Sequence, residues 1–115
     1  MANTFKVITK AGVTSADVIY TVAGSTTTII LGLLIGNTTS SAITSSVTLG
    51  TDTTNRAGNN DEANQSVELI TSAAIPANSS LELMAGNKIV METTDTLSVT
   101  GSGEVDIALS IMEIT

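Results

Sequence analysis

The 115-residue sequence contains no histidine and no cysteine. Histidine is the commonest general base near neutral pH and the commonest metal ligand, so its absence removes the Ser-His-acid and Cys-His catalytic arrangements. Without cysteine the chain has no disulfide, no thiolate metal site and no thiol redox chemistry. We therefore predict that the protein is not an enzyme and has no catalytic residue, no cofactor and no metal site.

Aromatic, proline and basic residues are also scarce. The aromatic side chains are Phe5 and Tyr20 and the single proline is Pro76, so we expect a core of aliphatic residues and methionine. Four basic residues stand against eleven acidic ones, which gives a net charge of −7. Binding to nucleic acid or to an anionic membrane surface depends on clustered lysine and arginine, so we expect neither as a partner.

Long apolar segments are missing as well. The longest dense apolar run, residues 29–35, has seven residues, whereas a membrane-spanning helix needs about 20. The first residues lack the basic start and apolar stretch of a signal peptide, so we expect a protein made and first kept in the cytoplasm. The length predicts one domain, residues 1–115.

Threonine is very abundant, with serine close behind. Both can lie on a pleated surface, and the stiff β-branched side chain of threonine favours strands. Apolar residues alternate with period two, and turn residues separate the alternating segments, which are residues 5–10, 18–22, 26–35, 43–49, 67–71, 81–83, 89–91, 97–99 and 105–111. This spacing predicts an all-β fold of eight or nine short strands in an antiparallel two-sheet sandwich, jelly-roll-like. Gly86 and Asn87 stand between two alternating segments and predict a tight hairpin there.

The segment of residues 26–35 is apolar on both alternate faces. One face carries Ile30 and Leu34 with Gly32 between them. Such a strand is either buried on both sides within the sandwich or placed against a neighbouring subunit. We predict Ile30 and Leu34 as subunit contacts, with a buried sandwich strand as the alternative. The N-terminal strand, with Phe5 and Ile8, and the loop of residues 52–65 are further segments that could contact a partner.

Two carboxylate pairs, Glu82 with Glu92 and Asp95 with Glu104, could resemble the acid pair of a glycosidase. Sugar-processing clefts usually stack their substrate on aromatic rings, which this chain almost lacks. The simpler interpretation places these carboxylates on solvent-facing strand and turn positions.

The loop of residues 50–65 is rich in asparagine, aspartate and glycine. Its oxygen-bearing side chains, which could bind calcium, are Asp52, Asn59, Asn60, Asp61 and Glu62. Their spacing matches no EF-hand, and the same composition is typical of any exposed turn, so we interpret this segment as a solvated loop. Three glycosylation sequons, at Asn37, Asn64 and Asn78, are expected by chance in a chain so rich in threonine and serine.

Four segments together resemble the small β-sandwich virion proteins of tailed bacteriophages. Residues 75–83 have a proline-led turn before a leucine-rich strand, residues 86–92 have a "k-I-v-l" strand, and residues 95–100 have a "D-x-L-x-V" strand. Residues 20–33 are similar to the opening of the same family, although Ala23 stands where that family usually has proline. The resemblance covers roughly residues 17–115.

The resemblance implies a structural role in a phage particle, and no functional residue is carried over from it. We expect a capsid decoration (cement) protein of the virion, assembled in the host cytoplasm, whose partners are its own copies, in a homotrimer, and the major capsid protein or other virion proteins. The alternatives are a neck, tail or fibre component and, from another class, a host-surface or glycan-binding module.

Overall fold

Residues 2–52, 64–84 and 87–115 are described by the computed structural model of this chain. Within these residues all regular secondary structure is strand, as the β-branched composition favours. The strands are β1 (Asn3–Val13), β2 (Asp17–Thr21), β3 (Thr27–Asn37), β4 (Ile43–Thr51), β5 (Gln65–Ile75), β6 (Ser80–Leu83), β7 (Ile89–Met91), β8 (Thr96–Gly101) and β9 (Val105–Ile114).

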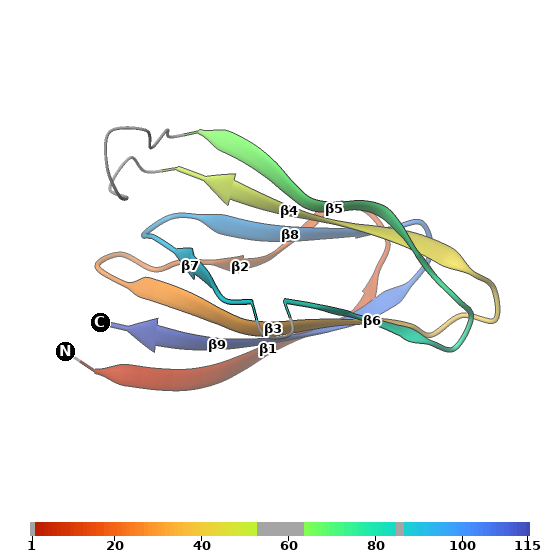
Figure 1. Cartoon of the computed structure of the whole chain (residues 1–115), viewed down its shortest axis with the longest axis horizontal. Helices are drawn as coiled ribbons and strands as arrows, with labels where there is room; N and C mark the ends of the chain where they lie inside the picture. Colours follow the sequence, from red (N-terminus) through yellow and green to blue (C-terminus); the bar gives the residue numbers. More distant parts are fainter. Residues whose placement is uncertain (1, 53–63, 85–86) are drawn as a thin grey trace.

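These strands form two antiparallel sheets that lie face to face (Figure 1). Sheet A has the order β1-β9-β3-β6, with β7 also paired to β3, and sheet B has the order β2-β8-β4-β5. The pairs are nested along the chain: β4 with β5, β3 with β6 and β7, β2 with β8, and β1 with β9. Nested antiparallel pairs of this kind wind into a jelly roll, so the predicted all-β two-sheet sandwich is confirmed.

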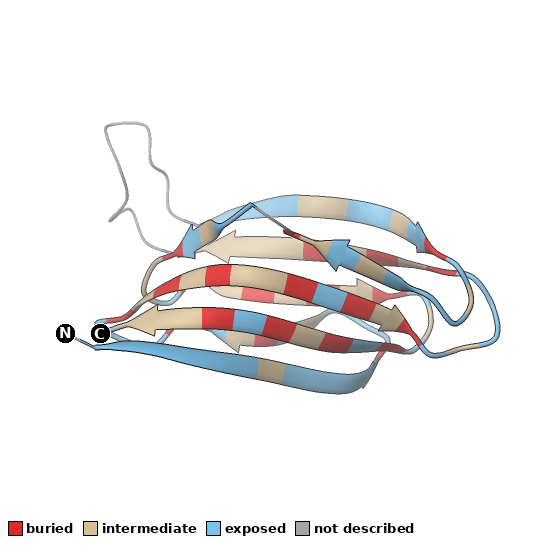
Figure 2. Cartoon of the chain, turned by 60° about the horizontal axis from the view of Figure 1, so that its bottom comes forward, coloured by how far each residue is buried: buried red, intermediate tan, exposed pale blue. Residues whose placement is uncertain are grey.

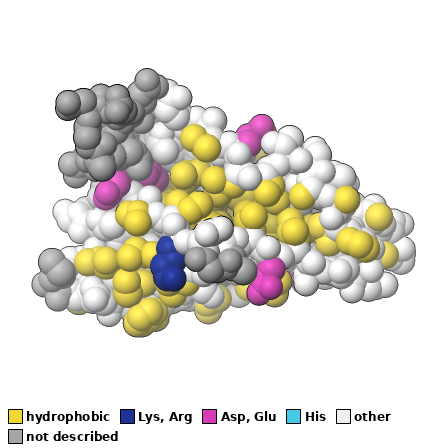
Figure 3. Space-filling view, in the orientation of Figure 1, with side chains coloured by type: hydrophobic (Ala, Val, Ile, Leu, Met, Phe, Trp, Pro, Cys, Tyr) yellow, Lys and Arg dark blue, Asp and Glu magenta, His cyan; other side chains and the backbone are white. Residues whose placement is uncertain are grey.

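The core between the sheets is aliphatic, as the scarcity of aromatic residues predicts. Its buried hydrophobic side chains, within the described ranges, are Val13, Ile19, Val22, Ile30, Leu33, Ile35, Ile43, Val47, Ile75, Met84, Met91, Leu97, Val99, Val105, Ile107, Leu109 and Ile111. Partly buried leucines and isoleucines of β5, β6 and β7 pack against this core. Figure 3 shows hydrophobic side chains in a band that runs lengthwise across this side of the molecule.

The predicted hairpin between residues 81–83 and 89–91 is wrong. Both segments are strands, but each pairs with β3: β6 lies opposite residues 33–36, and β7 lies opposite residues 28–30. They run in the same direction and form one interrupted edge of sheet A. The turn signal of Gly86 and Asn87 is local, whereas the strand partner is set by the apolar residues that face the core.

A β-bulge in β3 corrects a second expectation. The register with β9 shifts between Ile30 and Gly32, so Leu31 is the extra residue on β3. An extra residue reverses the alternation of side chains beyond it. Ile30 therefore faces the core with 0% exposure, whereas Leu34 faces outward with 43% exposure. The prediction that Ile30 and Leu34 share one face is wrong for this reason.

Asn37 ends β3 and holds two turns together at one end of the sandwich. Its side-chain nitrogen donates to the carbonyl oxygens of Ser41 (2.8 Å), Ile75 (3.1 Å) and Pro76 (3.1 Å). Its Oδ1 accepts from the N–H (2.9 Å) and the hydroxyl (2.8 Å) of Thr39. Because this amide is 3% exposed and donates to three acceptors, the first sequon asparagine has a structural role.

Candidate functional site

The outer face of sheet A, meaning the side chains of its strands that point away from sheet B, is the candidate interaction surface. The register places these side chains in rows across the sheet: Phe5, Met112, Ile29 and Val90; Val7, Ser110 and Gly32; Thr9, Ala108, Leu34 and Glu82; and Asp106, Gly36 and Ser80. Figure 2 turns sheet A toward the viewer and shows β1 exposed along nearly all of its length.

Large hydrophobic side chains are concentrated on this face. Phe5 is 71% exposed, Val7 62%, Val90 50% and Leu34 43%. These are four of the six large hydrophobic residues that are exposed in the described part of the chain. Exposed apolar residues that gather on one face of a protein, rather than singly, mark an interaction site.

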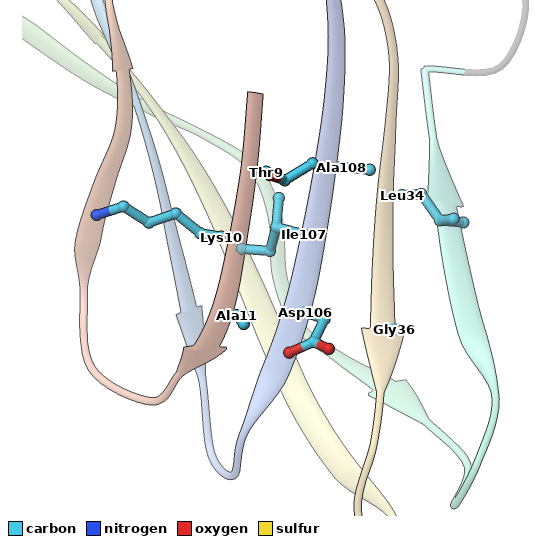
Figure 4. A pocket seen from close by; sticks show the side chains of 8 residues that line it. All are labelled: Thr9, Lys10, Ala11, Leu34, Gly36, Asp106, Ile107 and Ala108. Carbon is cyan, nitrogen blue, oxygen red and sulfur yellow. The ribbon is translucent and has the colours of Figure 1, made fainter. Parts of the chain in front are cut away.

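Small residues beside Leu34 give this face its shape. A hollow of about 370 Å³ lies over Gly36, Ala108 and the end of β1, and Figure 4 shows Leu34 on one side of it. A second hollow of about 270 Å³ is lined by Gly32 and Ser110, and it also touches Leu34 and Ala108. Leu34 is therefore a knob between two shallow depressions, a shape that a complementary apolar side chain can fill.

The strands of this face carry acidic residues, and the exposed Lys88 lies just before β7. The charged residues that the strands of sheet A place here are Glu82 and Asp106, and Asp106 Oδ1 accepts a 3.0 Å hydrogen bond from the Gly12 N–H. Lys10, although it borders the larger hollow, extends away from it in Figure 4 and forms a 2.9 Å ion pair with Asp17. An apolar surface with acidic groups at its margin suits a partner that has basic groups around an apolar patch.

The predicted contact residues separate into three environments. Leu34 and Phe5 lie together on the outer face of sheet A, two rows apart. Ile8 lies on the inner side of β1 and is partly buried against the core. Ile30 is fully buried, so its side chain has no surface to offer a partner; this corrects its prediction as a contact and corresponds to the buried-strand alternative.

Val7 and Val90 were missed by the sequence reasoning. Val7 shares the parity of Phe5 on β1, so alternation alone could have placed it on the same face. Val90 had no such signal, because its strand was assigned to the wrong partner.

One polar cluster joins the two sheets near the chain termini. The Tyr20 hydroxyl, from sheet B, donates to Glu113 Oε2 (2.5 Å) and shares a 2.8 Å hydrogen bond with the Thr28 hydroxyl. Lys6 Nζ lies 2.7 Å from Glu113 Oε1. The hydrogen bonds from Lys6 and then Tyr20 lower the pKa of Glu113. Burial, followed by the hydrogen bond to Glu113, raises the pKa of Tyr20 to about 12.

The two carboxylate pairs considered as glycosidase-like do not converge. Glu82 lies opposite Leu34 on β3, whereas Glu92 accepts a 3.2 Å hydrogen bond from Thr27 near the other end of that strand. At about 3.3 Å per residue this separates them by roughly 20 Å, whereas glycosidase pairs lie within about 10 Å.

Asp95 and Glu104 lie beyond opposite ends of β8. Asp95 is fully buried and accepts hydrogen bonds from the backbone N–H groups of Asp52 and Glu92, both 3.0 Å long. Its carboxylate thus fixes the turn between β7 and β8.

Of the residues considered for calcium, Asn59, Asn60, Asp61 and Glu62 lie outside the described residues. Among the described residues, no three carboxylates come together in a group that could hold a metal ion. The same residues contain no helix that could cross a membrane.

No protein-family model matches the chain, and no curated protein matches it. One similar solved structure comes from Bacillus endospore appendages, described as a family of disulfide-linked pili; it has 15% identity and a TM-score of 0.45, over 99% of this chain and 87% of that chain. Another comes from infectious bursal disease virus, Gx strain, with 13% identity and a TM-score of 0.26, over 96% of this chain and 36% of that chain. Similarity this weak does not indicate a function for this chain.

Proposed function

We propose that this chain is a structural protein of an assembled particle and, more specifically, a capsid decoration protein of a bacteriophage head. The observation that supports this proposal is the outer face of sheet A, where Phe5, Val7, Leu34 and Val90 are exposed and Leu34 borders two hollows. We assign this face to the contact with the major capsid protein. No catalytic role is part of the proposal.

The fold suits a protein that docks without changing shape. Both sheets are held by antiparallel ladders and an aliphatic core, so docking orders little backbone and loses little conformational entropy. The apolar side chains of the outer face gain about 25 cal/mol for each Å² removed from water, before the costs of association are subtracted. Glu82 and Asp106 would select a capsid surface that carries lysine or arginine beside its apolar patch.

Self-association completes the proposal. Several copies that are linked to one another bind a repetitive shell more tightly than one copy, because each further contact becomes intramolecular. The proposal requires only that copies are linked, whatever their number; the bacteriophage resemblance implies three, within a virion assembled in the host cytoplasm. By bridging neighbouring capsid subunits, such an assembly would oppose the pressure of the packaged genome.

The first test is the number of copies in purified particles. Several hundred copies per particle support a shell position, whereas about six or twelve copies, the numbers set by ring symmetry, indicate a neck or tail component. Particles that contain none of this polypeptide would end the virion proposal.

The second part of the test is the variant Leu34→Asp, which places a charge on the knob between the hollows. Because Leu34 is 43% exposed, we expect the variant to fold and to bind undecorated heads at least about tenfold more weakly, a loss of about 1.4 kcal/mol. The matched control is Thr48→Asp on the outer face of sheet B. Equal binding by the natural chain and Leu34→Asp would remove the outer face of sheet A from the contact.

A further inference from the structure

The edges of the two sheets differ in how open they are to another strand. A strand at the edge of a sheet has backbone N–H and C=O groups that can pair with another chain, and natural proteins block such edges by short strands, bulges or charges. In this jelly roll the edges are β1 and the pair β6 and β7 in sheet A, and β2 and β5 in sheet B.

Three of these edges are interrupted. The edge formed by β6 and β7 is divided into strands of four and three residues. The β2 edge has five residues and a register shift between Val18 and Tyr20. The β5 edge has eleven residues but two register shifts against β4, and Ser72 has a φ of 51°. Bulges of this kind twist an edge away from regular pairing.

The β1 edge is regular by comparison. From Asn3 to Lys10 it keeps an unbroken antiparallel register with β9, and the shift comes only after Lys10. Lysine on an edge strand normally discourages pairing. Here Lys6 pairs with Glu113 at 2.7 Å and Lys10 pairs with Asp17 at 2.9 Å, so both charges are balanced within the chain.

We propose that two copies of this chain associate through β1, antiparallel to each other, about a two-fold axis that passes through Val7. The inference goes beyond the proposed function because it names a second copy of the chain as the partner of this edge. Only the claim that the dimer docks more tightly rests on the proposed function. The inference replaces the homotrimer implied by the bacteriophage resemblance with a two-fold pair.

The register follows from parity, charge and the length of the regular stretch. A two-fold axis perpendicular to the sheet keeps outer side chains on the outer face, so each residue must lie opposite one of the same parity. Registers centred on Lys6, Ile8 or Lys10 place a lysine opposite a lysine, which is unfavourable. Registers centred on Phe5, Val7 or Thr9 avoid this, and the one centred on Val7 pairs the longest part of the regular stretch, residues 4–10. It pairs Lys6 with Ile8 and Phe5 with Thr9 of the other copy, and it places the two Val7 side chains together.

This pairing also arranges the candidate interaction surface. The two copies of sheet A become one continuous sheet, and the two-fold axis leaves both outer faces on the same side. Phe5 and Val7, the most exposed large hydrophobic residues in the described part of the chain, then lie at the centre of a doubled apolar surface. A pair of coplanar docking faces provides the avidity that a decoration protein needs.

A single-cysteine variant tests the register directly, because the chain has no cysteine of its own. Directly opposite residues in an antiparallel pair have Cα atoms about 4.5–5.5 Å apart, within the range of a disulfide. We expect Val7→Cys to form a disulfide-linked dimer under mild oxidation about tenfold faster than Val18→Cys, the matched variant at a 49%-exposed valine of β2. Phe5→Cys mixed with Thr9→Cys should cross-link, and each of the two alone should not.

Sedimentation equilibrium at about 0.15 M salt, where long-range charge repulsion is screened, gives the second readout. We expect the natural chain to be a dimer of 11.7 kDa subunits, Val7→Lys to be a folded monomer by circular dichroism, and Val18→Lys to remain a dimer. A monomeric or trimeric natural chain, or a Val7→Lys variant that is still dimeric, would overturn the proposal. Because Val7 also lies on the docking face, Leu34→Asp on β3, away from the β1 edge, separates the two proposals. We expect this variant to remain a dimer while it binds heads more weakly; a dimer with undiminished head binding would contradict the proposed function alone.

Discussion

The outer faces of the two sheets differ in chemistry along their central strands. Sheet A presents Phe5, Val7, Leu34 and Val90 to solvent. On its two central strands, β4 and β8, sheet B presents hydroxyl groups at the outward positions, which are Thr44, Ser46, Thr48, Thr96, Ser98 and Thr100. Its exposed valines, Val18 and Val67, lie on the edge strands β2 and β5. Both faces rest on the same aliphatic core.

That difference indicates which face is meant to be covered. Threonine keeps a high β-propensity while its hydroxyl remains solvated, so sheet B can stay in water at no cost to its strands. Leucine and phenylalanine on sheet A leave apolar area exposed in the isolated chain, and burying that area is favourable. The comparison therefore supports the proposal that sheet A docks and sheet B stays in solvent.

The largest expected effect is on the free energy of unfolding, and it tests whether Leu34 lies on the outer face. Ile30→Ala removes a fully buried side chain, and we expect it to lower the free energy of unfolding by about 2–5 kcal/mol. Leu34→Ala, four residues along the same strand, should cost no more than about 1 kcal/mol, because its side chain is already partly in water. Urea denaturation of both variants gives the two values. Similar losses would place Leu34 in the core and end the contrast between the sheets.

The extent to which the sequence predicts this fold depends on how local each feature is. Alternation of apolar residues located the strands, because the side-chain period of a strand is visible in any short window. The scarcity of aromatic residues predicted the aliphatic core for a similar reason. Neither signal needs information about which strand lies beside which.

The features that the sequence did not predict depend on distant partners. Leu31 is an ordinary apolar residue in an apolar run, and only the register with β9 makes it the extra residue of a bulge. Strict alternation therefore placed Ile30 with Leu34 and made a core residue into a predicted contact. Gly32, directly after Leu31, is the one local sign, since glycine within a strand often accompanies a bulge.

An intermediate effect concerns the cluster that joins the two sheets. The pKa of Glu113 lies below its ordinary value of 4.5, so its ionised form stabilises the fold above that value, and this stabilisation is lost as the pH falls through the lowered pKa. We expect Glu113→Gln to have a lower melting temperature than the natural chain at neutral pH and a difference that shrinks in acid. Thermal melts between pH 7 and pH 2 measure this, and a difference independent of pH would contradict it.

Tyr20 acts at the opposite end of the pH scale. Because its pKa is raised to about 12, the protonated hydroxyl stabilises the fold below the ordinary tyrosine value of 10.0, and this contribution is lost as the pH rises through about 12. Tyr20→Phe keeps the ion pair between Lys6 and Glu113, so it serves as the control. We expect its melting temperature to lose the decrease above pH 10 and to keep part of the decrease in acid.

The smallest expected effect asks whether apolar character alone makes a docking face. The double variant Thr48→Val and Ser98→Val places two valines opposite each other on the outer face of sheet B, and we expect its stability to change by no more than about 0.5 kcal/mol. To isolate sheet B, Leu34→Asp is added to block sheet A. The triple variant should bind undecorated heads no better than Leu34→Asp alone. A flat pair of valines lacks the knob and hollows that Gly32, Gly36 and Ala108 create around Leu34. Binding restored by the valines would mean that hydrophobicity, and not shape, distinguishes the two faces.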